Sequence, residues 1–594
     1  MNQGVERLLG NTFSYQTGLP VMPVPDLNIT CHKLIEWAAP LLTEQESINT
    51  REVIAQFLQL GGEGEKLQNE LTEWNKRNPQ SNWAAPIWRN IYLDSRDALV
   101  INSNVFYYLK SKLDEKTYSQ ANIAAALIVS VYNFIALLNK KELPVDMQKD
   151  TPLCMNQYHN LFSSTRIPQQ GKDQLKVSSS RMHIVIMHNM RIYKLDILDS
   201  TDNIRSPSAI KFDIDCILAI SGEGQNLGLL TTMQRDTWTE SRAALLQISA
   251  NNKSAMAIIE DATFVLCLDE NKPEQLNQIS KKLLHGDGRD RFFDKSLQFI
   301  VFKNGKTGIN FEHSGLDGSV MLRLVGHIYD TIDKVCIDER GAAAKTIIEE
   351  VTFDLDAVLI QTIRAAAETF IKHTANTQTR VLDFTQFGKN QIKQFGVSPD
   401  AFVQLALQLA EYKLYGKCYS AYEAVMTRTF IDGRIDVLYT VSPESMAFIY
   451  NMYDDKCSTQ TKQDSLIQAA RKHIERANEC RFGQGIYSHF LALKYHYKMA
   501  GHKLGIDSLP DVFTDKGYQI LNHSVVCSST TSDYGIDLAG YGPIVDDGYG
   551  IRYFQRDDSI CFNMTSRTEM QDNLDKMYIY IEQSLYEMAD LMQR

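Results

Sequence analysis

The chain has 594 residues, of which 44% are hydrophobic and 22% are charged, and its formal net charge is −11. This length exceeds what one hydrophobic core usually organises, so we expect two or more domains. The acidic balance argues against nucleic acid or an anionic membrane as the main partner. The ten cysteines show no CxxC pair and no zinc-type spacing, which favours reduced thiols and a cytoplasmic location.

Two stretches bear on membrane insertion. Residues 1–10 read MNQGVERLLG and lack the apolar core of a signal peptide. The longest apolar stretch, residues 123–138, is interrupted by Ser130 and Asn133 and is shorter than a membrane span. It therefore predicts a buried helix, and we expect no transmembrane segment.

Periodicity and turn signals predict that helices and strands are mixed along the chain. A proline-rich stretch at residues 19–27 should run extended over the surface. Helices are expected over 29–71, 119–140, 346–375, from 399 onward with Ser398 as N-cap, and from about 570 to the C-terminus. Strands are expected over 183–187, 191–197, 264–269, 296–302 and, as a pair, 551–566. The mixture indicates an α/β or α+β fold class.

The segment TGINFEHSGLDGSV, residues 307–320, places a histidine after a short strand. Asn304-Gly305 before it is a strong hairpin signal, and the strand over 296–302 would be its partner. His313 would then lie at a strand end before a glycine-bearing turn, which suits one base acting on one proton. A lone loop histidine is nevertheless more often without a role.

Several common catalytic signatures are absent from the sequence. Gly305-Lys306-Thr307 resembles the end of a P-loop, but Ile300 stands where the first glycine should be. The segment 222–228 lacks the dinucleotide spacing, and there is no GxSxG or HExxH motif. We therefore expect no nucleotide-binding site, no serine-hydrolase centre and no metal site.

The histidine segment NFEHSGLDG, residues 310–318, resembles the catalytic segment of the choline/carnitine acyltransferase family. Further segments resemble other blocks of that family in the same order, over residues 19 to 592. These segments are LPVMPVPDL, IYLDSRDALVINSN, LCMNQYHNLFSSTRIP, GLLTTMQRDTWTESR, RFFDKSLQF, FGKNQIKQFGVSPDAFVQLALQLAEYKL, YEAVMTRTFIDGR and YGPIVDDGYG.

The resemblance implies a fold of two similar α/β domains, each like chloramphenicol acetyltransferase, with the active site in a tunnel at their interface. The domain that bears His313 would span residues 97–380. The second domain, which would bind CoA and substrate, would combine residues 1–96 and 381–594. Nothing in the sequence indicates an assembly, so we expect a monomer.

The resemblance also implies a reaction. The family moves an acyl group from a CoA thioester to the hydroxyl of a quaternary-ammonium alcohol, without an acyl-enzyme. His313 matches the general base, and Asp317 matches an acidic position that either orients the histidine segment or forms a structural ion pair. The family's Ser-Thr-Ser run, which supplies the oxyanion donor, falls on Cys527-Ser528-Ser529 by ungapped counting from Tyr541. A short shift would use residues 529–531 instead; Ser529 belongs to both sets.

Coenzyme A carries several phosphates. Lys389 and Lys393 match the lysine pair that the family uses for the phosphate end, and Asp400 falls at the matching acidic position. Arg428 matches an arginine of the family that would assist the same ligand. Without the resemblance, a KxxxK pair would read as a solvated helix face.

Two positions separate choline from carnitine, because only carnitine has a carboxylate to be held. Ser488 stands where carnitine enzymes have Arg, and Val437 stands where they have Thr. Tyr422, Tyr541 and Tyr92 match aromatic positions that could face the ammonium group. The sequence thus favours choline O-acetyl transfer from acetyl-CoA, a neurotransmitter-synthesising reaction.

Departures around the alcohol site keep two alternatives open. Choline enzymes have Asn at the positions of Ser488 and Val437 and Arg at that of Tyr439, and Cys527 replaces the first hydroxyl of the Ser-Thr-Ser run. One alternative is an acyltransferase for carnitine or another alcohol. The other is a relative that binds CoA without catalysis.

Overall fold

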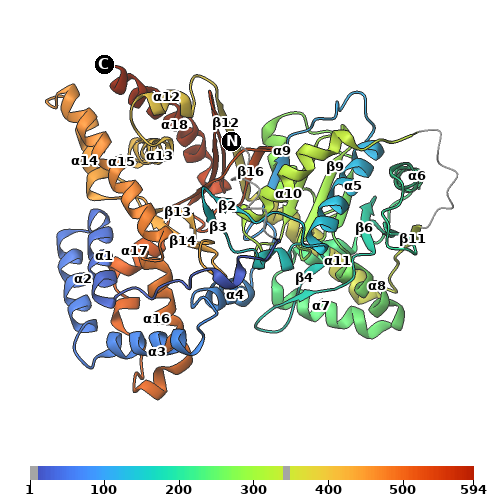
Figure 1. The fold of residues 1–594 in the computed structure, drawn as a ribbon, viewed down its shortest axis with the longest axis horizontal. Coiled ribbons are helices and arrows are strands. Elements are labelled where there is room, and N and C mark those ends of the chain that lie inside the picture. The colour runs from blue at the N-terminus through green and yellow to red at the C-terminus, as the bar shows by residue number, and fades with distance from the viewer. Residues whose placement is uncertain (1–10, 339–347) are drawn as a thin grey trace.

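The computed structural model describes residues 11–338 and 348–594. Its strands form two large sheets, each with helices packed around it (Figure 1). The first sheet has the order β11-β7-β6-β8-β9-β10-β1-β16, and the second has the order β12-β18-β17-β15-β13-β14. The first sheet consists of β1 (Val105–Leu109), β6 (His183–His188), β7 (Arg191–Asp196), β8 (Val265–Asp269), β9 (Leu297–Phe302), β10 (Thr307–Phe311), β11 (Ile348–Glu350) and β16 (Ile536–Gly540). The second consists of β12 (Thr377–Phe384), β13 (Ala421–Met426), β14 (Ile435–Tyr439), β15 (Val526–Thr530), β17 (Tyr549–Gln555) and β18 (Ile560–Arg567).

The two sheets repeat one topology. In the first, the run β7-β6-β8-β9-β10-β1 pairs antiparallel, parallel, parallel, antiparallel and antiparallel in turn. In the second, β14-β13-β15-β17-β18-β12 pairs with the same series of directions. Corresponding strands also come in the same order along the chain. The expectation of two similar α/β domains is therefore confirmed.

One strand joins the two halves. β16 lies between β15 and β17 in the chain, but it pairs with β1 of the first sheet, where Ala539 is opposite Tyr107. β12 of the second sheet begins at Thr377, before the boundary expected at residue 380. The division into 97–380 and 1–96 plus 381–594 stays a prediction, with β16 as a segment that crosses between the halves.

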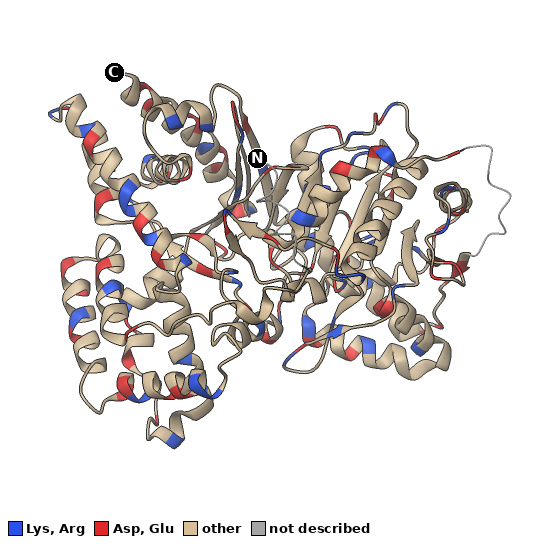
Figure 2. Cartoon of the chain, in the orientation of Figure 1, with Lys and Arg blue, Asp and Glu red and all other residues tan. Residues whose placement is uncertain are grey.

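The helices fall into three groups (Figure 1). Around the first sheet lie α5 (Gln120–Asn139), α6 (Pro207–Leu218), α7 (Arg235–Ile248), α8 (Ala250–Asp261), α9 (Leu276–Leu284), α10 (Gly318–Thr331) and α11 (Ala357–Ala375). Beside the second lie α12 (Lys389–Gln394), α13 (Pro399–Tyr415), α14 (Pro443–Tyr453), α15 (Thr459–Arg481) and α18 (Gln571–Gln593). A third group has α1 (Leu27–Ala38), α2 (Glu44–Phe57), α3 (Glu63–Arg77), α4 (Ala85–Asp94), α16 (Ile486–Ala500) and α17 (Lys516–Asn522). Short strand pairs are β2 (Met147–Gln148) with β3 (Thr151–Pro152) and β4 (Ser164–Ile167) with β5 (Gln174–Val177). Charges of both signs alternate over the outer helices (Figure 2).

Most local signals confirm the expected elements. Ser119 caps α5, and Ser398 caps α13 with Pro399 at its first position. β9 and β10 form the expected hairpin, and Gly305 takes a positive φ of 87° in its turn. α5 is the one described helix long and apolar enough to cross a membrane, but 83% of its apolar window is buried inside the protein. It is therefore a core helix, as expected. All ten cysteines are free.

One expectation needs correction, and two gain detail. The helix expected over 346–375 begins only at Ala357, because β11 first pairs with β7 at the sheet edge; residues 346 and 347 lie outside the described residues. The helical periodicity expected over 29–71 is confirmed as three helices, separated near Pro40 and Gly61. The proline-rich stretch is extended, as expected, with Pro20 and Pro23 exposed. It is also anchored, since Met22 is 2% exposed and its carbonyl accepts a hydrogen bond from Trp83.

Candidate active site

His313 lies in the loop between β10 and α10, next to the second domain. Its ring Nδ1 is 2.5 Å from the carbonyl oxygen of Leu316. Because a carbonyl only accepts hydrogen bonds, Nδ1 carries the proton and Nε2 keeps a lone pair. Burial lowers the pKa of His313 below its ordinary value, outweighing the opposing effect of Asp317. The imidazole is therefore neutral near pH 7 and has a free basic nitrogen.

Arg434, from the segment before β14, holds this loop across the domain interface. Its guanidinium donates to the carbonyl oxygens of His313 at 2.9 Å and Ser314 at 2.6 Å. It also forms an ion pair of 2.9 Å with Asp317, the N-cap residue of α10. Its Cζ lies 5.0 Å from the centroid of the Tyr92 ring, and that ring lies 5.2 Å from His313. The loop is thus fixed by the second domain.

Asp317 is placed to position the base rather than to react. Its Oδ1 is 3.9 Å from Nδ1 of His313, which is too far for a hydrogen bond. Its carboxylate is held by Arg434 and by the amide of Gln157 at 2.7 Å. Arg434 keeps the pKa of Asp317 below its ordinary value despite burial. This arrangement favours the structural role over direct catalysis.

A cavity of about 290 Å³ opens in front of His313. Both domains contribute to its lining, which includes Tyr92, Arg166, Tyr422, Ser529 and Tyr541. Ser529, on β15, accepts a hydrogen bond from the guanidinium of Arg552 on β17. Its own hydroxyl proton has no acceptor among the described residues. It can therefore donate into the cavity.

The neighbouring hydroxyls on β15 are already engaged. Ser528 donates to the carbonyl oxygen of Tyr422 at 2.9 Å, and Thr530 donates to that of Tyr553 at 2.9 Å. The Cys527 thiol lies 2.9 Å from the Tyr422 hydroxyl, and burial raises the pKa of this thiol to about 11. Among these residues, Ser529 is the best oxyanion donor.

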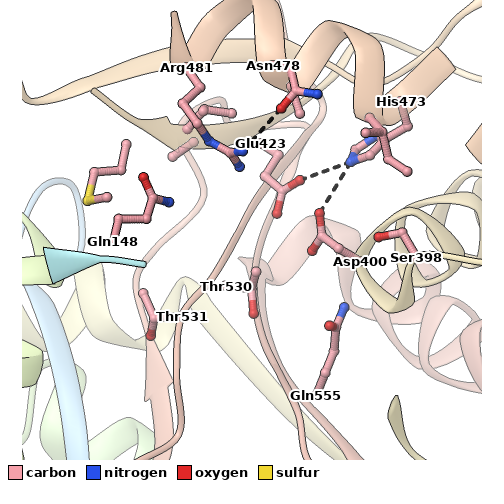
Figure 3. A pocket seen from close by; sticks show the side chains of 15 residues that line it. Gln148, Ser398, Asp400, Glu423, His473, Asn478, Arg481, Thr530, Thr531 and Gln555 are labelled. Carbon is pink, nitrogen blue, oxygen red and sulfur yellow. Dashed lines mark hydrogen bonds and ion pairs between the residues drawn. The ribbon is translucent and has the colours of Figure 1, made fainter. Parts of the chain in front are cut away.

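A second cavity, of about 550 Å³, follows the first along β15. Cys527, Ser528 and Ser529 line the first cavity, whereas Thr530 and Thr531 line the second; Ala424 borders both. Figure 3 shows Asp400, Glu423 and His473 pointing toward one another in the second cavity. The two cavities are consistent with one path through the interface that ends at His313.

The three ionisable groups of the second cavity form a charged cluster. His473 Nε2 is 3.3 Å from Asp400 and 3.5 Å from Glu423. These two carboxyl groups outweigh burial and raise the pKa of His473 to about 9, so the imidazole is protonated at neutral pH. The three donor atoms lie within 4.8 Å of one another, which would suit a metal. A protonated imidazole is not a metal ligand, however, and it already neutralises one carboxylate.

Comparison with known proteins identifies the family. A sequence model described as choline/carnitine O-acyltransferase matches residues 22–583. The chain belongs to this family. It is 31% identical to carnitine O-acetyltransferase of Columba livia, covering 98% of this chain and 94% of that protein. It is 30% identical to mitochondrial carnitine O-palmitoyltransferase 2 of Homo sapiens, covering 100% of this chain and 94% of that protein.

Similar solved structures are more distant. A trichothecene 15-O-acetyltransferase from Fusarium sporotrichioides has a TM-score of 0.39 and 9% identity, covering 84% of this chain and 94% of the other. A condensation domain of the calcium-dependent antibiotic synthetase has a TM-score of 0.37 and 10% identity, covering 86% and 95% of the two chains. The fold assignment therefore rests on the two sheets and on family membership.

Several residues expected in the family's site come together in these cavities. His313, Ser529, Tyr92, Tyr422 and Tyr541 line the first. Asp400 lines the second. Lys389 and Lys393 lie on α12, which packs on the turn after Gln555, a residue of the second cavity. The ammonium group of Lys389 is 3.0 Å from Asp557, and Lys393 is exposed. The lysines thus lie on a helix beside the second cavity, and their contact with CoA stays a prediction.

Three expected residues lie elsewhere among the described residues. Arg428 is 1% exposed, pairs with Asp146 at 2.7 Å and lines neither of these two cavities, so it links the two domains; its contact with CoA stays a prediction. Val437 is packed in the core beside the third helix group. Ser488 donates to Asp436 at 2.8 Å. Neither Val437 nor Ser488 lines the cavity of His313.

Four residues of the site were missed in the sequence. Glu423 and Arg434 stand in the block YEAVMTRTFIDGR, which resembles a block of the family, so the resemblance could have pointed to them. His473 and Arg552 carried no motif signal, since only α15 brings His473 to the second cavity and only the pairing of β15 with β17 brings Arg552 to Ser529 and Thr531.

Proposed function

We propose that this acyltransferase moves an acyl group, acetyl in the simplest case, from acyl-CoA to the hydroxyl of choline. The observation that carries the proposal is a neutral His313 with a free Nε2 in a cavity that also presents the Ser529 hydroxyl. Each supplies one of the two things that direct acyl transfer needs: a base and an oxyanion donor.

The reaction would run in two linked steps. Nε2 of His313 takes the hydroxyl proton while the alcohol oxygen attacks the thioester carbonyl carbon, and the Ser529 hydroxyl donates to the oxyanion that forms. The carbon–sulfur bond then breaks, and the proton on Nε2 passes to the departing CoA thiolate. The products are the ester and free CoA, and His313 is again neutral.

An acyl-enzyme on Cys527 is not part of the proposal. The thiolate, not the thiol, is the nucleophile in cysteine catalysis. Burial raises the pKa of the Cys527 thiol to about 11. Direct transfer to the alcohol therefore fits the site better.

Choline rather than carnitine is supported by the charges near the alcohol site. Arg166 is the one permanent cation among the described residues that line the cavity, and it is paired with Asp173 at 2.7 Å and Glu312 at 3.3 Å. Ser488, which lies outside the cavity and stands where carnitine enzymes have Arg, donates to the buried carboxyl of Asp436, so this position supplies no cation for a carboxylate. A quaternary ammonium without a carboxylate fits the faces of Tyr422 and Tyr541.

Carnitine is the second candidate, because the two relatives described above are carnitine acyltransferases by name. Release of the CoA thiol, measured with acetyl-CoA and each alcohol, separates the candidates. We expect a higher kcat/KM for choline. Ser488→Arg should raise the kcat/KM for carnitine, because it introduces the arginine that carnitine enzymes have at this position. A higher value for carnitine in the unaltered protein would reject choline. Thermal stabilisation by CoA without thiol release on either alcohol would indicate a non-catalytic relative.

A further inference from the structure

Arg552 is a buried cation with no acidic partner. It lies in β17 opposite Ser529 of β15 and Asn563 of β18, and it is 5% exposed. One guanidinium nitrogen donates to Ser529, and another donates to Thr531 at 2.6 Å. Its Nε is buried and has no hydrogen-bond partner. No described carboxylate forms an ion pair with it.

The other buried arginines of the described chain differ in this respect. Each has a carboxylate oxygen within 3.4 Å, because an isolated charge is costly to bury. These arginines are Arg166, Arg235, Arg291, Arg428, Arg434 and Arg476. Arg552 is the exception, so its counter-charge is expected from a molecule that binds.

The position of Arg552 indicates which molecule this is. Ser529 lines the cavity of His313, and Thr531 lines the second cavity. Arg552 lines neither cavity itself, but its guanidinium lies directly behind the residues at which the lining passes from the first cavity to the second. Its charge also acts on the hydroxyl of Tyr541, which lines the cavity of His313. A group bound there would lie beside the candidate oxyanion donor.

We propose that Arg552 binds a carboxylate at the far end of the acyl group, so that the preferred donors are CoA thioesters of dicarboxylic acids. The inference rests on the acyl transfer proposed for His313 and specifies its acyl substrate. The guanidinium presents planar, paired N–H donors, which match the two oxygens of a carboxylate. The chemistry of transfer is unchanged: the alcohol oxygen gains the acyl carbon, sulfur leaves, and the hydroxyl proton reaches the thiolate.

A four-way comparison of substrates tests this inference. Butyryl-CoA and succinyl-CoA have acyl groups of the same chain length and differ in a terminal methyl or carboxylate. Each is assayed with choline and with carnitine by release of the CoA thiol. We expect kcat/KM for succinyl-CoA to exceed that for butyryl-CoA by roughly tenfold to a hundredfold, the worth of a charge-assisted hydrogen bond. Equal values, or preference for butyryl-CoA, would overturn the inference and leave the proposed transfer intact.

Two variants test whether Arg552 causes the preference for succinyl-CoA. Arg552→Met should abolish the preference for succinyl-CoA, whereas Arg552→Lys, which keeps the charge but loses the planar donors, should retain part of it. The ratio of the two thioesters is the readout, because Arg552 also touches Ser529 and both rates will fall. If either variant fails to fold, the ratio in the unaltered protein still decides. The unaltered protein could instead prefer carnitine over choline and lose this preference in Arg552→Met. That result would show that Arg552 binds the carboxylate of the alcohol, and it would reject the acyl assignment. No thiol release in any combination would reject the transfer itself.

Discussion

Replacing Asp317 by Asn would break the buried ion pair that holds the loop of His313. The pair joins Asp317 to Arg434 at 2.9 Å, and the two side chains are 5% and 8% exposed. Removing one partner of such a pair altogether costs about 3–5 kcal/mol. Asn keeps one oxygen as acceptor, and Arg434 keeps the carbonyl oxygens of His313 and Ser314. We therefore expect the free energy of unfolding to fall by about 1.5–3 kcal/mol.

The same variant should change the pH dependence of the reaction. The negative charge of Asp317 raises the pKa of His313, whereas burial and Arg434 lower it. Removing that charge takes away the largest effect that raises the pKa of His313, so this pKa falls further. The base must be neutral to work, and the acid limb of kcat/KM should therefore move to lower pH. The measurement is thiol release over pH 5–8, beside urea unfolding of the same samples.

Asp146→Asn is the matched control. It breaks another buried pair between the domains, with Arg428 at 2.7 Å, but Asp146 is not among the groups that shift the pKa of His313. It should lower stability similarly and leave the acid limb in place. An acid limb that is unmoved or raised in Asp317→Asn, or that moves equally in both variants, would refute the positioning role of Asp317.

Three further predictions concern the rest of the site. Ser529→Ala should lower kcat by about 10²–10³ with little change in KM, because the oxyanion loses its donor; Ser528→Ala, whose hydroxyl already donates to Tyr422, should cost much less, and equal losses would reject Ser529. Lys389→Ala with Lys393→Ala should raise the KM for acetyl-CoA more than for dephospho-CoA, and equal effects would show that these lysines do not meet the 3′-phosphate. In the unaltered protein, the acid limb of kcat/KM should lie below pH 6.5, since burial lowers the pKa of His313 from that ordinary value; a limb above it would contradict a buried neutral base.

Local signals in the sequence were sufficient for much of the fold. Asn304-Gly305 fixed the β9–β10 hairpin, and Ser398-Pro399 fixed the start of α13, because turn and cap chemistry act over a few residues. β11 was mistaken for part of a helix, since its strand state depends on pairing with β7 far away in the chain. The crossing of β16 into the first sheet is likewise a long-range pairing that no local pattern encodes.

In the candidate site, too, local motifs could be predicted from the sequence, whereas long-range contacts could not. His313, Ser529 and Asp400 stand in recognisable segments, and the structure places each at a cavity. The partners that set their chemistry come from distant segments: Arg434 for the histidine loop and Arg552 for Ser529. The ion pair of Arg428 with Asp146 across the interface is another long-range contact that its segment does not encode.

The central claim is that His313 takes the proton of the alcohol, and one measurement tests it most directly. Thiol release from acetyl-CoA with choline is compared between the unaltered protein and His313→Ala, with CoA binding and urea unfolding measured on both. We predict that the variant folds, binds CoA and loses about 10²–10⁴ in kcat or more. Transfer at the unaltered rate by a folded His313→Ala protein would contradict the account.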